Sequence, residues 1–129
     1  MKKILVADVP QMDARYTAAL RGWEIEFART LGAARQALGG ARYDLIAIGV
    51  YFDDSQMFDL VRALRAAERT AALPILCVRG RPGFTAVSTG TLETALRALG
   101  ADRFIDLLEA AGNEAEASLR EAAERLVRD

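Results

Sequence analysis

The sequence contains no histidine, and this absence disfavours several classes of function at once. There is no imidazole to act as a general acid or base, no Ser-His-Asp or Cys-His arrangement, and the commonest zinc ligand is missing. The single cysteine, Cys77, cannot form an internal disulfide. It lies in an apolar run, where a free thiol behaves as a small hydrophobic side chain. Most hydrolases and metalloenzymes are therefore disfavoured, and we expect Cys77 in the core.

Long apolar runs and an excess of one charge are also absent. No run approaches the roughly 20 apolar residues of a membrane-spanning helix, and the first residues lead into a strand-like segment without a signal-peptide cleavage pattern. The 17 basic and 18 acidic residues are interspersed, which disfavours contact with nucleic acid or a membrane surface. We therefore expect a cytoplasmic protein whose partners are proteins or neutral ligands.

The 129 residues have the length of one domain, which we place at 1–129. Short apolar segments alternate with amphipathic segments of helical spacing. The expected strands are residues 4–7, 23–28, 43–48, 74–78 and 103–106, and the expected helices are 11–21, 31–38, 55–69, 91–99 and 113–127. This alternation predicts an α/β fold, a three-layer doubly wound sheet of five parallel strands with right-handed crossovers. The segment 23–28 is expected at or near an edge because its polar and apolar residues alternate.

In such sheets, ligands bind in the crevice beyond the carboxyl ends of the strands. The residues expected there are Asp8, Gly49, Arg79, Asp106 and Leu107. Four segments around these ends stand in the order and approximate spacing of the receiver domain of bacterial response regulators. They are residues 3–8, 43–46, 74–76 and 100–104. Over essentially its whole length the chain resembles a CheY-like receiver, which implies a flavodoxin-like fold.

The resemblance implies a set of functional positions, most of which carry an unsuitable residue here. A working receiver has an acidic pair after the first strand, an acceptor aspartate after the third, a threonine or serine after the fourth and a lysine after the fifth. The matching residues in this sequence are Asp8 with Val9, Gly49, Arg79 and Leu107. The aromatic switch position does match, as Phe104. The chain thus resembles a degenerate receiver, or pseudo-receiver, without the phospho-acceptor.

The chemistry of phosphoryl transfer agrees with this interpretation. Glycine offers no nucleophile, and Mg²⁺ is usually held by one or two carboxylates together with phosphate oxygens. Asp8 is the only remaining candidate ligand, so we expect neither a metal nor another cofactor. Asp53 and Asp54 follow Gly49 in the chain; they either form a capped turn at the start of the next helix, as is ordinary for aspartate, or supply a substitute acceptor at Asp53.

Arg79 is the most informative departure from the receiver pattern. A guanidinium at the mouth of the crevice could pair with Asp8 and fill the space that the metal and the phosphoryl group would otherwise occupy. Alternatively, Arg79 and Arg81 point into solvent, as most arginines do. The sequence leaves both possibilities open.

Two functions of different classes follow from these residues. The first is a phosphorylation-independent, receiver-like signalling module that acts through protein contacts in or beside a two-component phosphorelay pathway, and is not an enzyme. The second is a sensor of a small ligand or anion, which would bind in the crevice to Arg79, Arg81 and the loop of residues 80–85.

For the first function we expect the working surface on the last two predicted helices and the strand between them, where receivers commonly contact their partners. Leu107 and Leu108 follow that strand directly, in a connection that is usually polar. They either form an exposed contact for a homodimer or a protein partner, or fold back onto the core. Charged residues would surround this contact, namely Glu93, Arg97 and Arg120.

Overall fold

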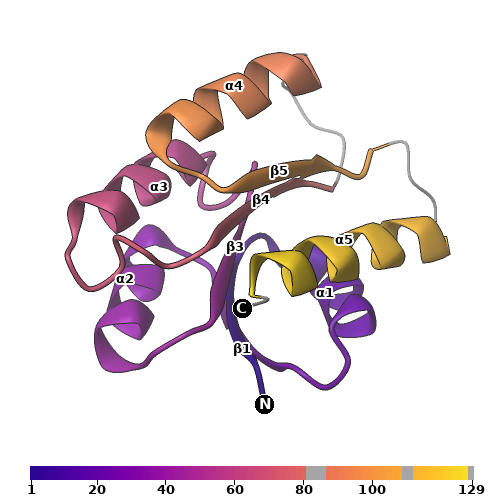
Figure 1. Ribbon diagram of the computed structural model, residues 1–129, viewed down its shortest axis with the longest axis horizontal. Coiled ribbons are helices and arrows are strands. Elements are labelled where there is room, and N and C mark those ends of the chain that lie inside the picture. Colours follow the sequence, from indigo (N-terminus) through magenta and orange to yellow (C-terminus); the bar gives the residue numbers. More distant parts are fainter. Residues whose placement is uncertain (81–86, 109–111, 128–129) are drawn as a thin grey trace.

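The computed structural model describes residues 1–80, 87–108 and 112–127. Within them, five parallel strands form one sheet in the order β2-β1-β3-β4-β5. The strands are β1 (Lys3–Ala7), β2 (Glu24–Ala28), β3 (Leu45–Gly49), β4 (Ile75–Arg79) and β5 (Arg103–Asp106). The helices are α1 (Asp13–Ala19), α2 (Leu31–Gly40), α3 (Met57–Ala66), α4 (Thr89–Leu99) and α5 (Gly112–Leu126). Helices α1 and α5 cover one face of the sheet and α2, α3 and α4 cover the other (Figure 1). The predicted three-layer, doubly wound α/β fold is confirmed.

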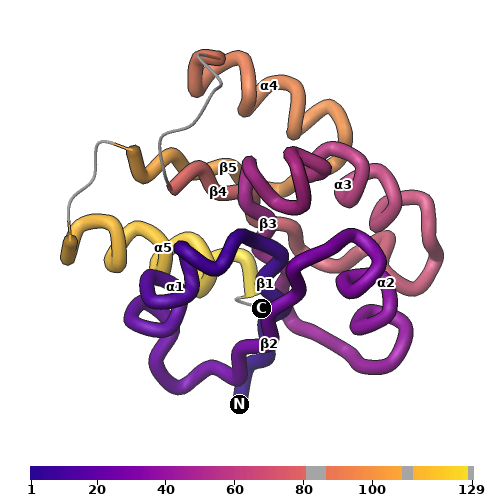
Figure 2. Tube along the Cα trace, turned by 180° about the vertical axis from the view of Figure 1, so that it is seen from behind, coloured from indigo at the N-terminus to yellow at the C-terminus, as the bar shows by residue number. Residues whose placement is uncertain are grey.

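The two faces of the sheet form two separate cores. On one face, alternate strand residues such as Leu5 and Ile46 pack against α2, α3 and α4, which follow one another along that face when the molecule is seen from behind (Figure 2). On the other face, Ile4 and Val6 pack against α1 and α5. Every residue of β3 and β4 is buried, which is why these strands read as continuous apolar runs. Strand β2 is one of the two edge strands and is only partly covered, as its alternating sequence predicts.

Cys77 lies in β4 and is fully buried, so its predicted place in the core is confirmed. Burial raises the pKa of its thiol to about 12. The thiol therefore stays protonated and behaves as an apolar group.

The turn before α3 differs from the prediction. Asp53, Asp54 and Ser55 all have left-handed backbones, with φ of 44°, 55° and 66°, and α3 begins after Gln56 without a side-chain cap. The prediction that these residues cap α3 is therefore wrong. Instead, the Asp53 Oδ2 accepts a hydrogen bond from the backbone N–H of Leu31 at 2.8 Å. It thereby satisfies a free donor at the start of α2, a helix that lies elsewhere in the sequence.

The helix ends follow ordinary capping chemistry. Thr30 caps α2, its Oγ1 accepting from the N–H of Ala33 at 3.0 Å. Ser88 caps α4 in the same way, so this helix begins at Thr89, two residues before the predicted start. It ends at Gly100, whose φ of 112° is readily adopted only by glycine. None of the helices in the described residues has the length and apolar character needed to span a membrane.

Candidate functional site

The crevice beyond the carboxyl ends of the strands brings together residues that are far apart in the sequence. Strands β1 and β3 are neighbours in the sheet although β2 lies between them in the chain, so this is the point where the strand order reverses and where ligands usually bind. The register aligns Ala7 with Ile48 and Gly49 with Val78. The residue after β1, Asp8, therefore lies beside Gly49 at the end of β3.

Asp8 is buried, with only 4% of its surface exposed. Its Oδ1 accepts from the backbone N–H of Val9 at 2.7 Å, and its Oδ2 accepts from the hydroxyl of Tyr16 at 3.0 Å. Burial raises the pKa of Asp8 to about 6, although these two hydrogen bonds and the charge of Arg29 act in the opposite direction. The same burial, together with Asp8, raises the pKa of Tyr16 well above its usual value. Tyr16 therefore remains a hydrogen-bond donor to this carboxyl.

Gly49 lies directly beneath the Asp8 carboxyl group. A Cβ atom added to Gly49 would overlap the Oδ1, Cγ and Oδ2 atoms of Asp8. The absence of a side chain is thus what lets the Asp8 carboxyl lie over the end of β3. The Asp8 carboxyl is therefore located where a side chain at position 49 would begin.

Arg79 does not pair with Asp8, so that prediction is wrong, and the alternative that it points into solvent is also wrong. The Nε and Nη2 atoms of Arg79 donate to the Oδ2 of Asp106 at 3.0 and 2.5 Å. Its Nη1 donates to the carbonyl of Val87 at 2.7 Å and its Nη2 to the Oγ1 of Thr89 at 3.2 Å. The physical reason is the strand order, because Arg79 is directly opposite Asp106 on the neighbouring β5, whereas β3 separates it from Asp8.

Asp106 is the centre of this second cluster. Its Oδ2 also accepts from the Oγ1 of Thr89 at 2.7 Å, and its Oδ1 accepts from the N–H of Leu108 at 3.0 Å. Partial burial alone would raise the pKa of Asp106, but the hydrogen bonds from Arg79, Thr89 and Leu108 outweigh it and hold the pKa below its usual value. The ion pair of Arg79 and Asp106 thus ties the first residue of α4 to the ends of β4 and β5. Sequence reasoning placed Asp106 in the crevice but did not recognise its partner; the strand order would have identified it.

Leu107 is buried, with 2% of its surface exposed, and packs on the face covered by α1 and α5. Its predicted role in an exposed interaction surface is therefore wrong. The N–H of Leu107 donates to the carbonyl of Arg79 at 2.8 Å, so the strand alternation continues for one more residue and directs the side chain inward. Leu108 is 40% exposed, which agrees with the prediction. Phe104 is buried in the core on the α4 side of the sheet.

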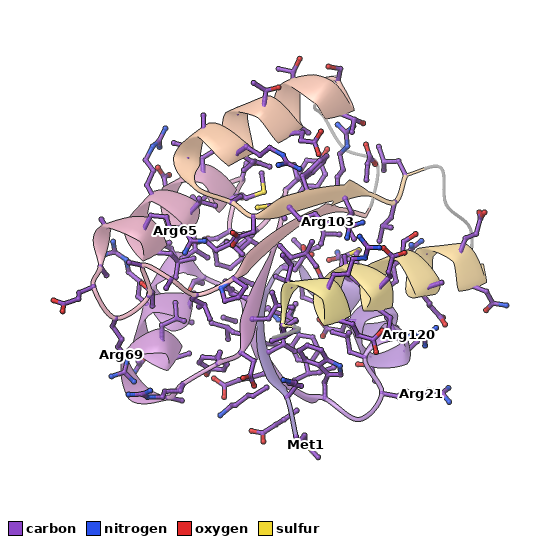
Figure 3. All side chains as sticks on the ribbon, viewed as in Figure 1. Met1, Arg21, Arg65, Arg69, Arg103 and Arg120 are labelled. Atoms are coloured by element: carbon purple, nitrogen blue, oxygen red, sulfur yellow. The ribbon has the colours of Figure 1, made fainter. Side chains whose placement is uncertain are left out.

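In the predicted charged rim, Arg97 and Arg120 are exposed and Glu93 is half-buried. Glu93 and Arg97 lie one turn apart on α4 and form an ion pair at 3.7 Å, and Arg120 lies on α5 (Figure 3). Such solvated pairs contribute little to stability. The large hydrophobic side chains that are exposed within the described ranges are Met1, Val87 and Leu108.

Two further expectations concern ligands of the crevice. Across residues 1–80, 87–108 and 112–127, no three acidic or cysteine side chains lie together in a group able to hold a metal ion. Val9, at the position of the second receiver carboxylate, is half-buried. Arg81 and residues 81–85, which the sensor hypothesis requires, lie outside the described part of the chain.

The comparisons with known proteins concern the fold. No protein-family model and no curated protein matches this sequence. The signal receiver domain of a signal transduction histidine kinase from Syntrophus aciditrophicus matches with a TM-score of 0.77 at 22% identity, over 98% of this chain and 90% of that one. The chemotaxis response regulator CheY4 of Vibrio cholerae matches with a TM-score of 0.75 at 22% identity, over 95% of this chain and 98% of that one.

A third solved structure is the receiver domain of the sensor histidine kinase PA1611 from Pseudomonas aeruginosa PAO1, which holds a magnesium ion in its active-site cleft. Its TM-score is 0.75 at 21% identity, over 99% of this chain and 98% of that one. At these identities the likeness establishes the fold. The structure neighbours are receiver domains, and this chain has their flavodoxin-like, CheY-like fold.

Proposed function

We propose that this chain is a cytoplasmic, receiver-like signalling module that works without phosphorylation and is not an enzyme. It acts through protein contacts in or beside a two-component pathway. The signalling part of the proposal is supported by the receiver domains that share its fold. The independence from phosphorylation is supported by the position of Asp8.

The observation that carries the proposal is the overlap between Asp8 and the space above Gly49. Phosphoryl transfer needs a nucleophile, and it needs charge neutralisation by a metal or by cationic side chains. Position 49 has no nucleophile, and the Asp8 carboxyl occupies the volume where one would begin. Its bonds to Val9 and Tyr16 hold it there. A bound Mg²⁺ would have to draw this carboxyl out of a buried, hydrogen-bonded position.

The cluster around Asp106 supports the same proposal. At the positions where the receiver resemblance implies a hydroxyl and a lysine, this chain has Arg79 and Leu107. The Arg79 guanidinium makes four hydrogen bonds to groups of the protein. The ion pair of Arg79 and Asp106 therefore holds the start of α4 against the end of β5 without any phosphoryl group. The same bonds weaken the sensor alternative, because Arg79 is the main cation which that hypothesis assigned to a ligand.

The test of phosphorylation independence is intact-mass spectrometry after incubation with acetyl phosphate and Mg²⁺. We expect no phosphoryl adduct on the wild type, under conditions that phosphorylate a receiver with its acceptor aspartate in place. We also expect none on Gly49→Asp, because Asp8 already occupies the space for the new side chain. A stoichiometric adduct on the wild type would overturn the proposal.

The protein-contact part is tested at Leu108, which is exposed beside the Arg79–Asp106 pair. Affinity capture from lysate and sedimentation of the purified protein are compared for the wild type, Leu108→Glu and the control Ala33→Glu, which changes an exposed alanine on α2. We expect the partner or the homodimer to be lost only in Leu108→Glu. Equal binding by all three proteins refutes this surface, and the absence of any partner or self-association refutes the function.

A further inference from the structure

A hollow of about 510 Å³ opens at the opposite end of the sheet, beside the residues at which the strands begin. It is far from the Asp8 crevice in the fold, because it is formed by the segments that lead into β1, β3 and β4 and by the end of α5. This volume lies within the usual range of small-molecule sites. A second hollow of about 210 Å³ between α2 and α3 adjoins it and shares Leu38, Arg69 and Thr70.

The wall of this hollow is firmly held. The Arg65 Nη1 donates to the backbone carbonyls of the segment between α3 and β4, namely those of Thr70, Ala71 and Leu73, at 3.2, 3.0 and 2.8 Å. Its Nη2 donates to the Oδ2 of Asp102 at 2.9 Å. The buried Thr70 hydroxyl donates to the carbonyl of Leu64 at 2.7 Å. The hollow is therefore formed before any ligand arrives, and binding would require little ordering of the protein.

The charge around the hollow is one-sided. Among the described residues, the side chains that line it include the exposed cations Lys2, Arg42 and Arg69 and one acid, Asp44, although the whole chain has a net charge of −1. The Asp44 Oδ2 already accepts from the backbone N–H of Lys3 at 2.8 Å. Within the described residues, the side chains of Lys2 and Arg42 have no ion-pair partner.

Part of the remaining lining is apolar and less exposed than the cations, and it lies beside the polar side chains of Tyr43 and Thr70. Leu38 is buried and Leu73, Pro74 and Leu126 are half-buried. The site thus combines positive charge at its exposed part with several apolar side chains that are less exposed. A ligand that satisfies both has a negatively charged group joined to an apolar body.

We propose that this hollow binds a small organic anion, a carboxylate or phosphate ester with a short apolar chain. The anionic group lies among Lys2, Arg42 and Arg69, and the apolar chain contacts Leu38 and Leu73. The proposal goes beyond the signalling function and does not depend on it, because no residue of the crevice lines the hollow.

The test is a titration of ¹⁵N-labelled protein with octyl phosphate below its micellar concentration, in which the amide chemical shifts are measured at each step. We expect saturable changes at Tyr43, Thr70, Leu73 and Val127. We expect Arg42→Gln combined with Arg69→Gln to weaken binding about tenfold, since two solvated charge contacts each contribute roughly 1 kcal/mol or less. The matched control, Arg62→Gln combined with Arg120→Gln, also removes two exposed arginines and should leave the affinity unchanged.

Further titrations test the apolar chain and the phosphate group separately, and distinguish a free ligand from a lipid surface. Octanol and inorganic phosphate should each bind at least about tenfold more weakly than octyl phosphate, since each lacks one kind of contact. The proposal is overturned if either binds as well, if shifts appear elsewhere, or if both double variants behave alike. Binding to anionic vesicles without binding to monomeric octyl phosphate would assign the cations to a lipid surface and also overturn it.

Discussion

Asp8→Asn is expected to stabilise the protein at neutral pH, although it removes the negative charge of a buried carboxylate in the candidate site. In the native state the pKa of Asp8 is raised from 3.8 to about 6, with burial as the largest cause. The native state therefore binds this proton more tightly than the unfolded state does. Stability from this group is greatest below about pH 4 and falls as the pH rises towards 6. Above pH 6 the charged carboxyl lowers the free energy of unfolding by about 3 kcal/mol relative to the protonated form.

The asparagine side chain resembles the protonated carboxyl in shape. Its Oδ1 can accept from the N–H of Val9, as the Asp8 Oδ1 does at 2.7 Å, and its Nδ2 can donate to the Tyr16 oxygen. A less favourable bond to Tyr16 would offset about 1 kcal/mol. We therefore expect Asp8→Asn to raise the free energy of unfolding by about 2 kcal/mol at pH 7.5. The difference should nearly vanish at pH 4.

The assay is urea unfolding followed by circular dichroism at intervals from pH 4 to pH 8. The control is Glu68→Gln, which makes the same chemical change at an exposed position between α3 and β4 and should alter stability by less than about 0.5 kcal/mol. The reasoning is refuted if Asp8→Asn destabilises the protein at pH 7.5, or if its effect is the same at pH 4 and pH 7.5.

Three other perturbations test the rest of the site. Arg79→Met leaves Asp106 without its cation and should lower the free energy of unfolding by about 3 kcal/mol in urea titrations; adding Asp106→Asn should restore part of this loss, and full additivity of the two changes would contradict the pairing. Because the pKa of Asp106 is held below its usual value, its stabilising contribution is present above about pH 4 and is lost at lower pH, so Asp106→Asn should destabilise at pH 7 but little at pH 2. Leu107→Ala should cost about 2 to 4 kcal/mol because it opens a cavity, whereas Leu108→Ala should change the melting temperature very little; similar effects of both would mean that their burial is misassigned. Millimolar Mg²⁺ should leave the melting temperature unchanged, since the Asp8 carboxyl is buried and hydrogen-bonded to Val9 and Tyr16, and a clear rise would show binding to the native state.

The fold could be predicted from the sequence because its signals are local and repeated. Apolar runs such as that around Ile46 are long enough for a buried strand, and the segments between them have helical spacing. The alternation of the two then leaves few topologies. The edge position of β2 was predicted for the same reason, since Glu24 and Glu26 alternate with apolar residues.

The candidate site was predictable only in part. Its location and the absence of an acceptor at position 49 follow from the order of the motifs. The cap that Thr30 provides for α2 is a local interaction of the kind that a sequence can indicate, because it spans only three residues. The sequence did not predict that Asp53 binds the start of α2. That hydrogen bond joins residues 22 positions apart, and it forms only because the turn before α3 lies beside the start of α2 in the folded protein.

The sequence by itself determined which chemistry this chain lacks, since a histidine that is missing from the chain, or a side chain that is missing at position 49, is absent in any conformation. The tertiary structure alone decided how the remaining charges are paired. Arg79 meets Asp106 because β4 and β5 are neighbours, while β3 separates it from Asp8. Asp8 lies over Gly49 because β1 and β3 are adjacent and glycine leaves the space empty. Strand order and side-chain volume act between distant residues, and neither can be read from local patterns in the chain.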